Sequence, residues 1–230
     1  MKRFWKDVAV TADGAGHGVT LDGRPLRTPG RLPLILPQVA LADAIADEWR
    51  AVEGEIARGT MRLTGLANAA IERIAPDPAT FAAGIAAFGE SDLLCYRAEQ
   101  PPELAAREAA AWDPLLDWAR ARYDVHFAIV AGVVHHAQPP ATVARLAEAV
   151  RARDAFRLAA LQQIVSITGT LVGALALEED ACTADMLWDA ATVDERWQVE
   201  LWGEDTLAQA ATAARRADFD AATRLIDLVR

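Results

Sequence analysis

The sequence predicts an α+β protein with a small β-rich N-terminal domain and a larger, all-helical C-terminal domain. Residues 8–36 consist of short extended runs separated by turn signals, and residues 38–56 carry one apolar helical stripe. After residue 60 the apolar residues recur at helical spacing almost to the end of the chain. We therefore assign residues 1–60 to a β-meander with a covering helix, and residues 61–230 to a helical bundle.

The β-meander is predicted from four short extended segments and one turn signal. Residues 8–11 and 19–21 are apolar strand candidates, and the dipeptide Asp22-Gly23 is a hairpin turn signal. Residues 25–29 and 32–36 are further extended pieces that Pro and Gly interrupt. Three or four strands of this length are not stable alone, so another element must cover one face of the sheet.

The segment after residue 38 is the predicted cover. Its apolar residues recur at spacings of four and three, namely Leu41, Ile45, Trp49, Val52 and Ile56. This spacing places them on one face of a helix. Trp49 is the largest of them, so we expect it to have a structural role in the domain core.

The second domain is predicted to be helical over residues 61–74, 79–88, 102 onward, 142–153, 155–177, 183–202 and 217–230. Residues 125–134 are its one strand candidate. Within the helix that starts near residue 102, Asp113 precedes Pro114, which is typical of an N-cap followed by proline at the first helical position. We expect the helix to restart there, with Trp112 packed inward.

Composition excludes several classes of protein. The chain has 230 residues, 53% of them hydrophobic, and a net charge of −10, which is ordinary for a globular protein. The negative charge disfavours binding to nucleic acid and to anionic lipid. Residues 158–177 are uncharged and long enough to span a bilayer, but Gln162, Gln163 and Ser166 make them too polar, so we expect no membrane insertion.

No motif in the sequence points to catalysis. The glycine-rich run at residues 14–18 precedes a strand instead of the helix that a phosphate loop needs. The histidines lack metal-ligand spacing, and two distant cysteines exclude a disulfide framework. We therefore expect no enzyme, no cofactor and no metal. A small-molecule enzyme with an inter-domain cleft is the alternative, and it requires a pocket that joins His126, His135 or Cys95 to a carboxylate. A constitutive subunit of a larger complex is a third possibility.

Negative charge is concentrated near the C-terminus. Residues 178–205 contain ten acidic residues against the single basic residue Arg196, a net charge of −9 from ten minus one. Residues 1–31 carry six basic and three acidic residues, a net charge of +3. The acidic segment fits either a solvated helix face or a docking surface for a basic partner.

The predicted helix over residues 183–202 carries tryptophan on two opposite faces. Trp188, Glu195, Gln198 and Trp202 would share one of these faces. That face could be packed inside the protein, with Glu195 paired to an arginine. It could equally be an exposed aromatic and acidic patch, which is typical of protein-docking hot spots. The residues alone leave both interpretations open.

Seven segments in order resemble one family. They are RFWKDV (3–8), LDGRPLRTP (21–29), DEW (47–49), LTGLANAAIE (63–72), DLLCYRA (92–98), WDPLLDW (112–118) and DERWQVELWG (194–203). Together they resemble the assembly chaperones of the F-type ATP synthase that handle the alpha subunit of the catalytic head. This resemblance covers nearly the whole chain.

The resemblance implies a chaperone without enzymatic activity that binds the free alpha subunit transiently, before alpha joins beta, and so prevents aggregation. It also implies a functional acidic residue in the helix before Trp202-Gly203, for which Glu195 is the best match and Asp194 the alternative. We expect partner binding by Glu195, Asp194, Trp188, Gln198, Trp202 and Asp205, and structural roles for Trp49, Asn68, Trp112 and Asp113. The N-terminus lacks a signal or transit peptide, so we expect a bacterial cytoplasmic protein that is a monomer when free.

Overall fold

The computed structural model describes residues 2–203 and 205–230, so Glu204, one of the ten clustered acids, lies outside the described residues. The chain divides into two compact units. The first comprises Met1–Pro78, Asp154–Ala160 and Ala221–Arg230, and the second comprises Ala79–Arg153 and Leu161–Asp220. The domain boundary near residue 60 stays a prediction.

The first unit contains an antiparallel three-stranded sheet in the order β1-β2-β3. Its strands are β1 (Val8–Asp13), β2 (Gly16–Leu21) and β3 (Arg24–Pro25). Val10 lies opposite Val19, so the two strands share one apolar face. The predicted piece over residues 32–36 adds no fourth strand, but Leu36 exchanges two backbone hydrogen bonds with His17 (2.9 and 2.8 Å).

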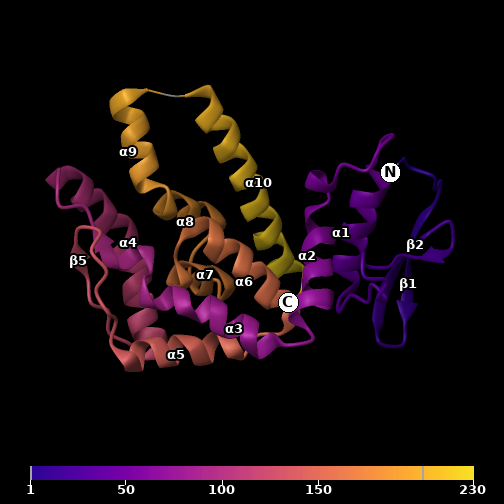
Figure 1. Cartoon of the computed structure of the whole chain (residues 1–230), viewed down its shortest axis with the longest axis horizontal. Helices are drawn as coiled ribbons and strands as arrows, with labels where there is room; N and C mark the ends of the chain where they lie inside the picture. The colour runs from indigo at the N-terminus through magenta and orange to yellow at the C-terminus, as the bar shows by residue number, and fades with distance from the viewer. Residues whose placement is uncertain (1, 204) are drawn as a thin grey trace. The chain divides into compact units, whose positions relative to one another are not determined.

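Helix α1 (Val39–Arg50) packs against β1 and β2 (Figure 1). Leu41, Ile45 and Trp49 are buried, as the apolar stripe predicts. The α+β fold class is therefore confirmed. Helix α1 ends earlier than the stripe suggested, because the guanidinium of Arg3 binds the carbonyl oxygens of Arg50 (3.1 Å) and Val52 (2.8 Å) and holds the following chain beside the N-terminus.

Three further elements of the first unit follow along the chain. They are the 3₁₀ turn η1 (Arg58–Thr60), helix α2 (Arg62–Ala69) and the π-helical turn η2 (Ala70–Ile74). The carboxylate of Glu48 accepts hydrogen bonds from the N–H groups of Leu63 (2.7 Å) and Thr64 (2.8 Å). Since these groups lie in the first turn of α2 and have no partner within the helix, Glu48 caps α2 and fixes it to α1.

The rest of the chain is almost entirely helical (Figure 1). Its elements are α3 (Pro78–Ala86), η3 (Ala87–Glu90), η4 (Leu93–Cys95), β4 (Tyr96–Arg97), α4 (Pro102–Tyr123), β5 (Val130–Ala131), α5 (Pro140–Arg151), α6 (Ala155–Thr168), α7 (Leu171–Glu178), α8 (Ala184–Ala191), α9 (Val193–Trp202) and α10 (Thr206–Leu228). The strand predicted over residues 125–134 is reduced to β5, which pairs in parallel with β4.

Two helix boundaries predicted between residues 102 and 177 are wrong. Helix α4 runs through Pro114 without restarting, and the Asp113 carboxylate accepts a hydrogen bond from Arg97 (2.6 Å) instead of capping a helix. The helix predicted over residues 155–177 breaks at Gly169, which has a φ of 72°. The Thr170 hydroxyl then caps α7 by accepting the N–H of Gly173 (2.9 Å). Among the described residues, none of the helices is both long and apolar enough to cross a membrane.

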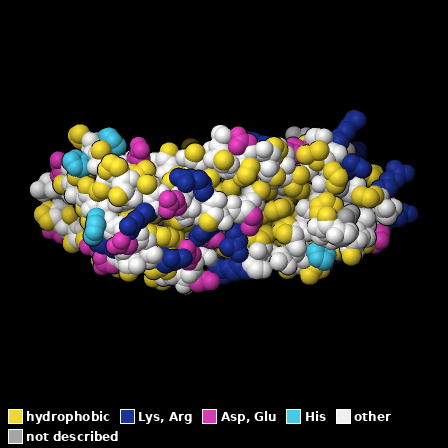
Figure 2. Space-filling model, turned by 90° about the horizontal axis from the view of Figure 1, so that it is seen from below, with side chains coloured by type: hydrophobic (Ala, Val, Ile, Leu, Met, Phe, Trp, Pro, Cys, Tyr) yellow, Lys and Arg dark blue, Asp and Glu magenta, His cyan; other side chains and the backbone are white. Residues whose placement is uncertain are grey.

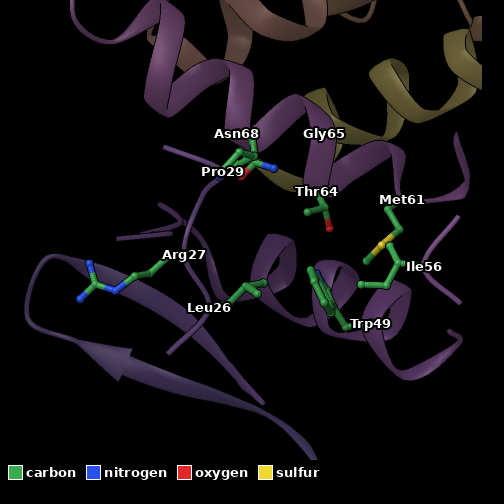
Figure 3. Close-up of a pocket in the computed structure, with 9 residues that line it drawn as sticks. All are labelled: Leu26, Arg27, Pro29, Trp49, Ile56, Met61, Thr64, Gly65 and Asn68. Carbon is green, nitrogen blue, oxygen red and sulfur yellow. The ribbon is translucent and has the colours of Figure 1, made fainter. Parts of the chain in front are cut away.

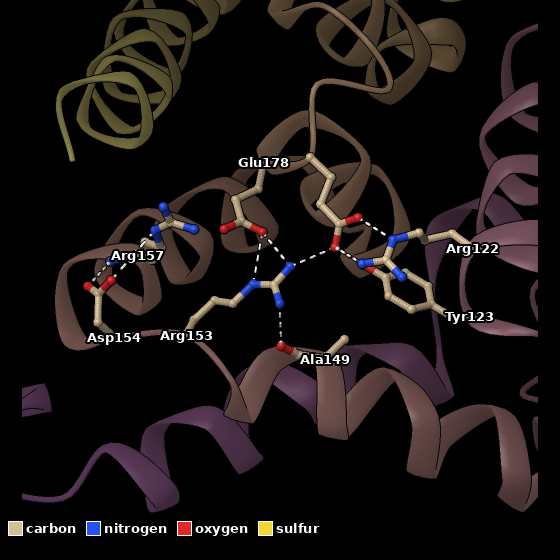
Figure 4. A network of polar contacts seen from close by, with 8 residues as sticks. Arg122, Tyr123, Ala149, Arg153, Asp154, Arg157 and Glu178 are labelled. Carbon is tan, nitrogen blue, oxygen red and sulfur yellow. Dashed lines mark hydrogen bonds and ion pairs between the residues drawn. The ribbon is translucent and has the colours of Figure 1, made fainter. Parts of the chain in front are cut away.

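An ion-pair network joins α4, α5 and the end of α7 (Figure 4). The guanidinium of Arg153 donates to Glu178 (2.6 Å), to Glu179 (2.8 Å) and to the carbonyl of Ala149 (3.0 Å). Burial acts to raise the pKa of Glu179, but hydrogen bonds from Arg122, Tyr123 and Arg153 outweigh it and hold that pKa below its ordinary value. Two of the ten clustered acids are therefore structural.

Basic side chains are also unevenly placed. In Figure 2, Lys and Arg gather at the right of the view, where β1–β3 lie, and acidic and basic side chains mix over the rest of this face. This agrees with the net charge of +3 over residues 1–31.

Candidate partner-binding surface

The predicted helix over residues 183–202 is broken at Thr192, between α8 and α9. A helix end leaves its last carbonyl oxygens without partners inside the helix. Here the Thr192 hydroxyl donates to the carbonyl of Trp188 (2.8 Å), and the Arg196 guanidinium donates to that of Asp189 (2.7 Å). The indole N–H of Trp112 donates to the carbonyl of Ala190 (2.7 Å). Tertiary partners thus stabilise the break.

The break separates residues that one continuous helix would place on a common face. Trp188 is buried against Phe219 of α10, with ring centroids 5.5 Å apart, and its role in partner binding stays a prediction. Trp202 has an exposed fraction of 78%. Of the two interpretations of this segment, burial inside the protein is therefore correct for Trp188, and exposure on the surface is correct for Trp202.

Helices α9 and α10 form a hairpin whose end is exposed and apolar. Gly203, with a φ of 84°, ends α9, and the Asp205 carboxylate caps α10 by accepting the N–H of Leu207 (2.9 Å). We name four exposed apolar residues the hairpin tip: Val199 (43% exposed), Leu201 (56%), Trp202 (78%) and Leu207 (80%). Helix α10 begins eleven residues before the predicted start at 217, because Asp205 supplies this cap.

A groove of about 580 Å³ lies between α9 and the first half of α10. Its charged lining residues are the acids Glu195, Glu200 and Asp205 and the bases Arg196 and Arg216. Glu195 pairs with Arg215 of α10 at 2.9 Å, and both side chains are about half exposed. The carboxylate is thus held at the groove by an arginine and remains accessible to a partner. Gln198 is exposed on the same helix.

Asp194 faces a different environment from its neighbour Glu195. It lines a second cavity, of about 680 Å³, together with Glu108 of α4. Burial, with a hydrogen bond and a negative charge from Asp194, raises the pKa of Glu108 to about 6, although a hydrogen bond from the Ala98 N–H opposes the shift. The buried Oδ1 of Asp194 has no hydrogen-bond partner among the described residues. The geometry places Asp194 in the packing of α9 against α4 and leaves Glu195 at the open groove.

Glu108→Gln is expected to raise the free energy of unfolding by about 1 kcal/mol at pH 7.5. The pKa of Glu108 is raised in the folded state, so its ionised form opposes folding increasingly as pH rises from about 4.5 through about 6. A glutamine stays neutral, can still accept the Ala98 N–H (2.7 Å in the parent) and can donate toward Asp194. The increase in stability, measured as the melting temperature in thermal unfolding, should be present at pH 7.5 and absent at pH 4.5.

The control is Glu103→Gln, which removes an exposed carboxylate from the same helix. Glu103 lies in the first turn of α4, where a negative charge is favourable, so this variant should show no gain in melting temperature at pH 7.5 and at most a small loss. A lower melting temperature for Glu108→Gln at pH 7.5 would show that the ionised pair is needed for folding.

The other predicted residues are not part of the hairpin tip. Trp112 is buried, Asp113 pairs with Arg97, and Trp49 and Asn68 line a pocket in the first unit. Sequence reasoning missed Leu207 and Arg215. The Asp205-Thr206 helix-start signal could have revealed Leu207, because it predicts a new helix directly after Gly203.

The alternative of an enzyme finds no support in this geometry. Cys95 is buried, and burial raises the pKa of its thiol to about 12, where the nucleophilic thiolate is scarce. Nδ1 of His135 lies 3.4 Å from the hydroxyl of Tyr96. Tyr96 lines the cavity that contains Glu108 and Asp194, but the described lining of that cavity includes neither His126, His135 nor Cys95. Within the part of the chain that the structure describes, no three His, Cys, Asp or Glu side chains gather as a metal site.

Comparison with known proteins decides the family. Residues 2–120 match the ATP12 chaperone protein family. The chain belongs to the ATP12 chaperone family. Like the family, it is a chaperone for assembly of the F1 part of the ATP synthase, of the type that binds the alpha subunit, and it is not an enzyme. The recognition from the seven sequence segments is confirmed.

Solved structures agree with this ATP12 assignment over the whole chain. The crystal structure of Atp12 from Paracoccus denitrificans is 40% identical with a TM-score of 0.94, covering 100% of this chain and 98% of that one. An aspartate-to-lysine variant of that Atp12 matches with the same values. A structure from Agrobacterium tumefaciens, described as that of a chaperone, is also 40% identical with a TM-score of 0.95, covering 100% of this chain and 86% of that one. The mitochondrial protein atp12 of Schizosaccharomyces pombe is 22% identical over 214 residues, covering 88% of this chain and 74% of that protein.

Proposed function

We propose that the hairpin tip and the groove between α9 and α10 bind the free alpha subunit of the F-type ATP synthase. The observation that carries this proposal is the joint exposure of Trp202 and Leu207, 78% and 80%, on the end of a helical hairpin. Apolar residues gathered in this way on a protein surface mark interaction sites, and tryptophan is the residue most enriched in binding hot spots.

Acidic side chains beside the hairpin tip favour a basic partner. Glu195, Glu200 and Asp205 line the groove beside the tip, and Glu200 also pairs with Arg107 (2.7 Å). Acidic groups at the rim of an apolar contact steer basic partners and mainly raise the association rate. The surface therefore suits a partner that presents apolar residues ringed by basic ones.

The proposed mechanism is reversible masking. An alpha subunit that has not yet met beta exposes the apolar surface that beta later covers, and such surfaces aggregate. The hairpin tip covers part of that surface until beta competes for it. Because assembly requires release, the affinity is moderate and free beta should displace the chaperone.

Glu195→Lys tests this proposal. The substitution reverses the charge at the groove and places the new ammonium beside Arg215, so it should weaken alpha binding about tenfold. The fold should survive, since an exposed pair contributes at most about 1 kcal/mol to stability. The readout is light scattering of purified alpha subunit during dilution refolding, with the chaperone variant added in increasing amounts.

Asp117→Lys is the matched control, because Asp117 is an exposed acid of α4 with its own arginine partner, Arg120 (2.6 Å). It should protect alpha as the parent chain does. Equal protection of alpha by Glu195→Lys and the parent would remove Glu195 from the binding surface. Loss of the folded state in Glu195→Lys, seen by circular dichroism, would make Glu195 a structural residue.

We further propose that the protein is a monomer when free and acts in a bacterial cytoplasm. The similarity to proteins of Paracoccus denitrificans and Agrobacterium tumefaciens, both bacteria, supports this location. Size-exclusion chromatography with light scattering should give the monomer mass, 24.7 kDa, for the chaperone alone. A dimer that dissociates on adding alpha would place the hairpin tip in a self-interface.

A further inference from the structure

The first unit contains a second apolar pocket, which belongs to neither α9 nor α10. Its volume is about 430 Å³, and it is lined by Leu26, Arg27, Pro29, Trp49, Ile56, Met61, Thr64, Gly65 and Asn68 (Figure 3). We name it the Trp49 pocket. A volume of this order suits a small ligand or one large side chain with its flanking backbone.

Hydrogen bonds to two carboxylates fix the positions of the segments that form the walls of the Trp49 pocket. Glu48 binds the first turn of α2, which carries Thr64 and Gly65. Glu72 accepts the backbone N–H of Gly30 in the loop that carries Pro29. A hydrogen bond from Thr28, followed by that from Gly30, holds the pKa of Glu72 below its ordinary value, so Glu72 stays ionised at neutral pH. The pocket is therefore a fixed opening between braced walls.

Trp49 brings an unsatisfied donor to this pocket. Its side chain is more than nine-tenths buried, and its indole N–H has no hydrogen-bond partner among the described residues. In Figure 3 the nitrogen lies on the part of the ring that faces Thr64. The ring of Trp5 packs against Trp49 with centroids 5.1 Å apart and fixes its orientation. A buried N–H without a partner is costly, so a group that enters the pocket and offers an acceptor to this N–H gains a hydrogen bond there.

Gly65 keeps the pocket open. It lies within α2, where glycine weakens a helix relative to alanine, and its φ is not in the left-handed region. A Cβ atom at this position would meet no atom within 4 Å. Neither backbone conformation nor close packing therefore requires glycine here, and its effect in the fold is to leave the pocket unfilled.

We propose that the Trp49 pocket binds an apolar side chain of an extended protein segment, whose adjacent backbone carbonyl accepts the Trp49 indole N–H. Apart from Arg27, the lining is apolar or neutral, and the Asn68 amide both donates and accepts, which matches a peptide group. The Arg27 side chain extends away from the other labelled lining residues in Figure 3 and donates to the carbonyl of Arg31 (2.9 Å), so the charged group of the lining is not directed at a bound segment. Incompletely folded chains present such segments, so the pocket is a second client contact that does not depend on the hairpin tip.

The first test measures binding of a blocked apolar peptide, acetyl-Gly-Leu-Phe-Gly-amide, to the full chain by ¹⁵N NMR. The Trp49 indole signal, assigned through Trp49→Phe, should move as the peptide is added. Gly65→Leu should fill the pocket and weaken binding at least tenfold. Gly84→Leu is the matched control, since Gly84 also lies in a helix with open space at its Cβ, and it should bind as the parent does.

Trp49→Phe keeps a ring in the pocket but removes the N–H, so it should weaken peptide binding roughly tenfold, the effect of one buried hydrogen bond. Glu195→Lys should bind the peptide normally, which separates this site from the groove between α9 and α10. The proposal is overturned by unchanged binding to folded Gly65→Leu, by an unmoved Trp49 indole signal, or by binding only of the free-acid peptide. Concentration-dependent dimerisation that Gly65→Leu abolishes would assign the pocket to a second copy and overturn it as well.

Discussion

Arg153→Ala is expected to lower the free energy of unfolding by about 3–5 kcal/mol. The Arg153 guanidinium binds Glu178 and Glu179 at the end of α7, and the Glu178 side chain has an exposed fraction of only 2% (Figure 4). Removing the cation leaves a buried carboxylate without the guanidinium that offsets its lost hydration. Urea denaturation followed by circular dichroism at pH 7.5 measures the change.

Two further variants separate burial from charge. Arg153→Lys keeps the positive charge but loses the planar guanidinium that reaches both carboxylates. Its loss of unfolding free energy should therefore lie between zero and that of Arg153→Ala. Arg120→Ala breaks the exposed pair with Asp117 and should cost about 1 kcal/mol or less. Equal costs for Arg153→Ala and Arg120→Ala would contradict a buried network and show that water reaches Glu178 freely.

The fold class could be predicted because the signals that define it are local. The spacing of Leu41, Ile45 and Trp49 fixes an apolar helix face within a few turns, and the Asp22-Gly23 turn fixes the adjoining strands. Most errors in the predicted helix boundaries arise where a residue far away in the sequence stabilises the end of a helix or its continuation. Helix α1 ends beside Arg3, and α7 begins where the buried carboxylate of Asp92 accepts the N–H of Val172 (2.9 Å). No periodicity within a segment contains that information.

At the candidate site, too, local properties could be predicted from the sequence and contacts between distant residues could not. The sequence indicated Glu195 and Trp202 because residue type and an acidic neighbourhood are local properties. It could not indicate that Trp188 is buried, because the covering residue Phe219 lies 31 positions later in α10. It also assigned Trp49 and Asn68 structural roles, since an open pocket beside a tryptophan arises only when α1, α2 and the loop at Pro29 are brought together.

Trp112→Ala is expected to cost about 3–5 kcal/mol of stability and to weaken protection of the alpha subunit. The ring is 2% exposed and lies 4.8 Å from the Arg97 guanidinium, so alanine leaves a large cavity within the second unit. The same substitution removes the donor to the Ala190 carbonyl, one of the groups that the break between α8 and α9 exposes. Trp112 therefore acts on the core and on the direction in which α9 leaves α8.

Trp112→Phe separates these two effects. It keeps most of the ring volume but leaves the Ala190 carbonyl without its indole donor, so it should cost about 1–3 kcal/mol. Because the loss is local to the break, hydrogen exchange should rise at residues 188–193 and stay unchanged in α7. Protection of alpha should fall in proportion to that opening, since α9 carries both Glu195 and Trp202. Parent-like exchange and protection in Trp112→Phe would mean that Thr192 and Arg196 maintain the break by themselves, and that Trp112 supports the surface through its volume alone.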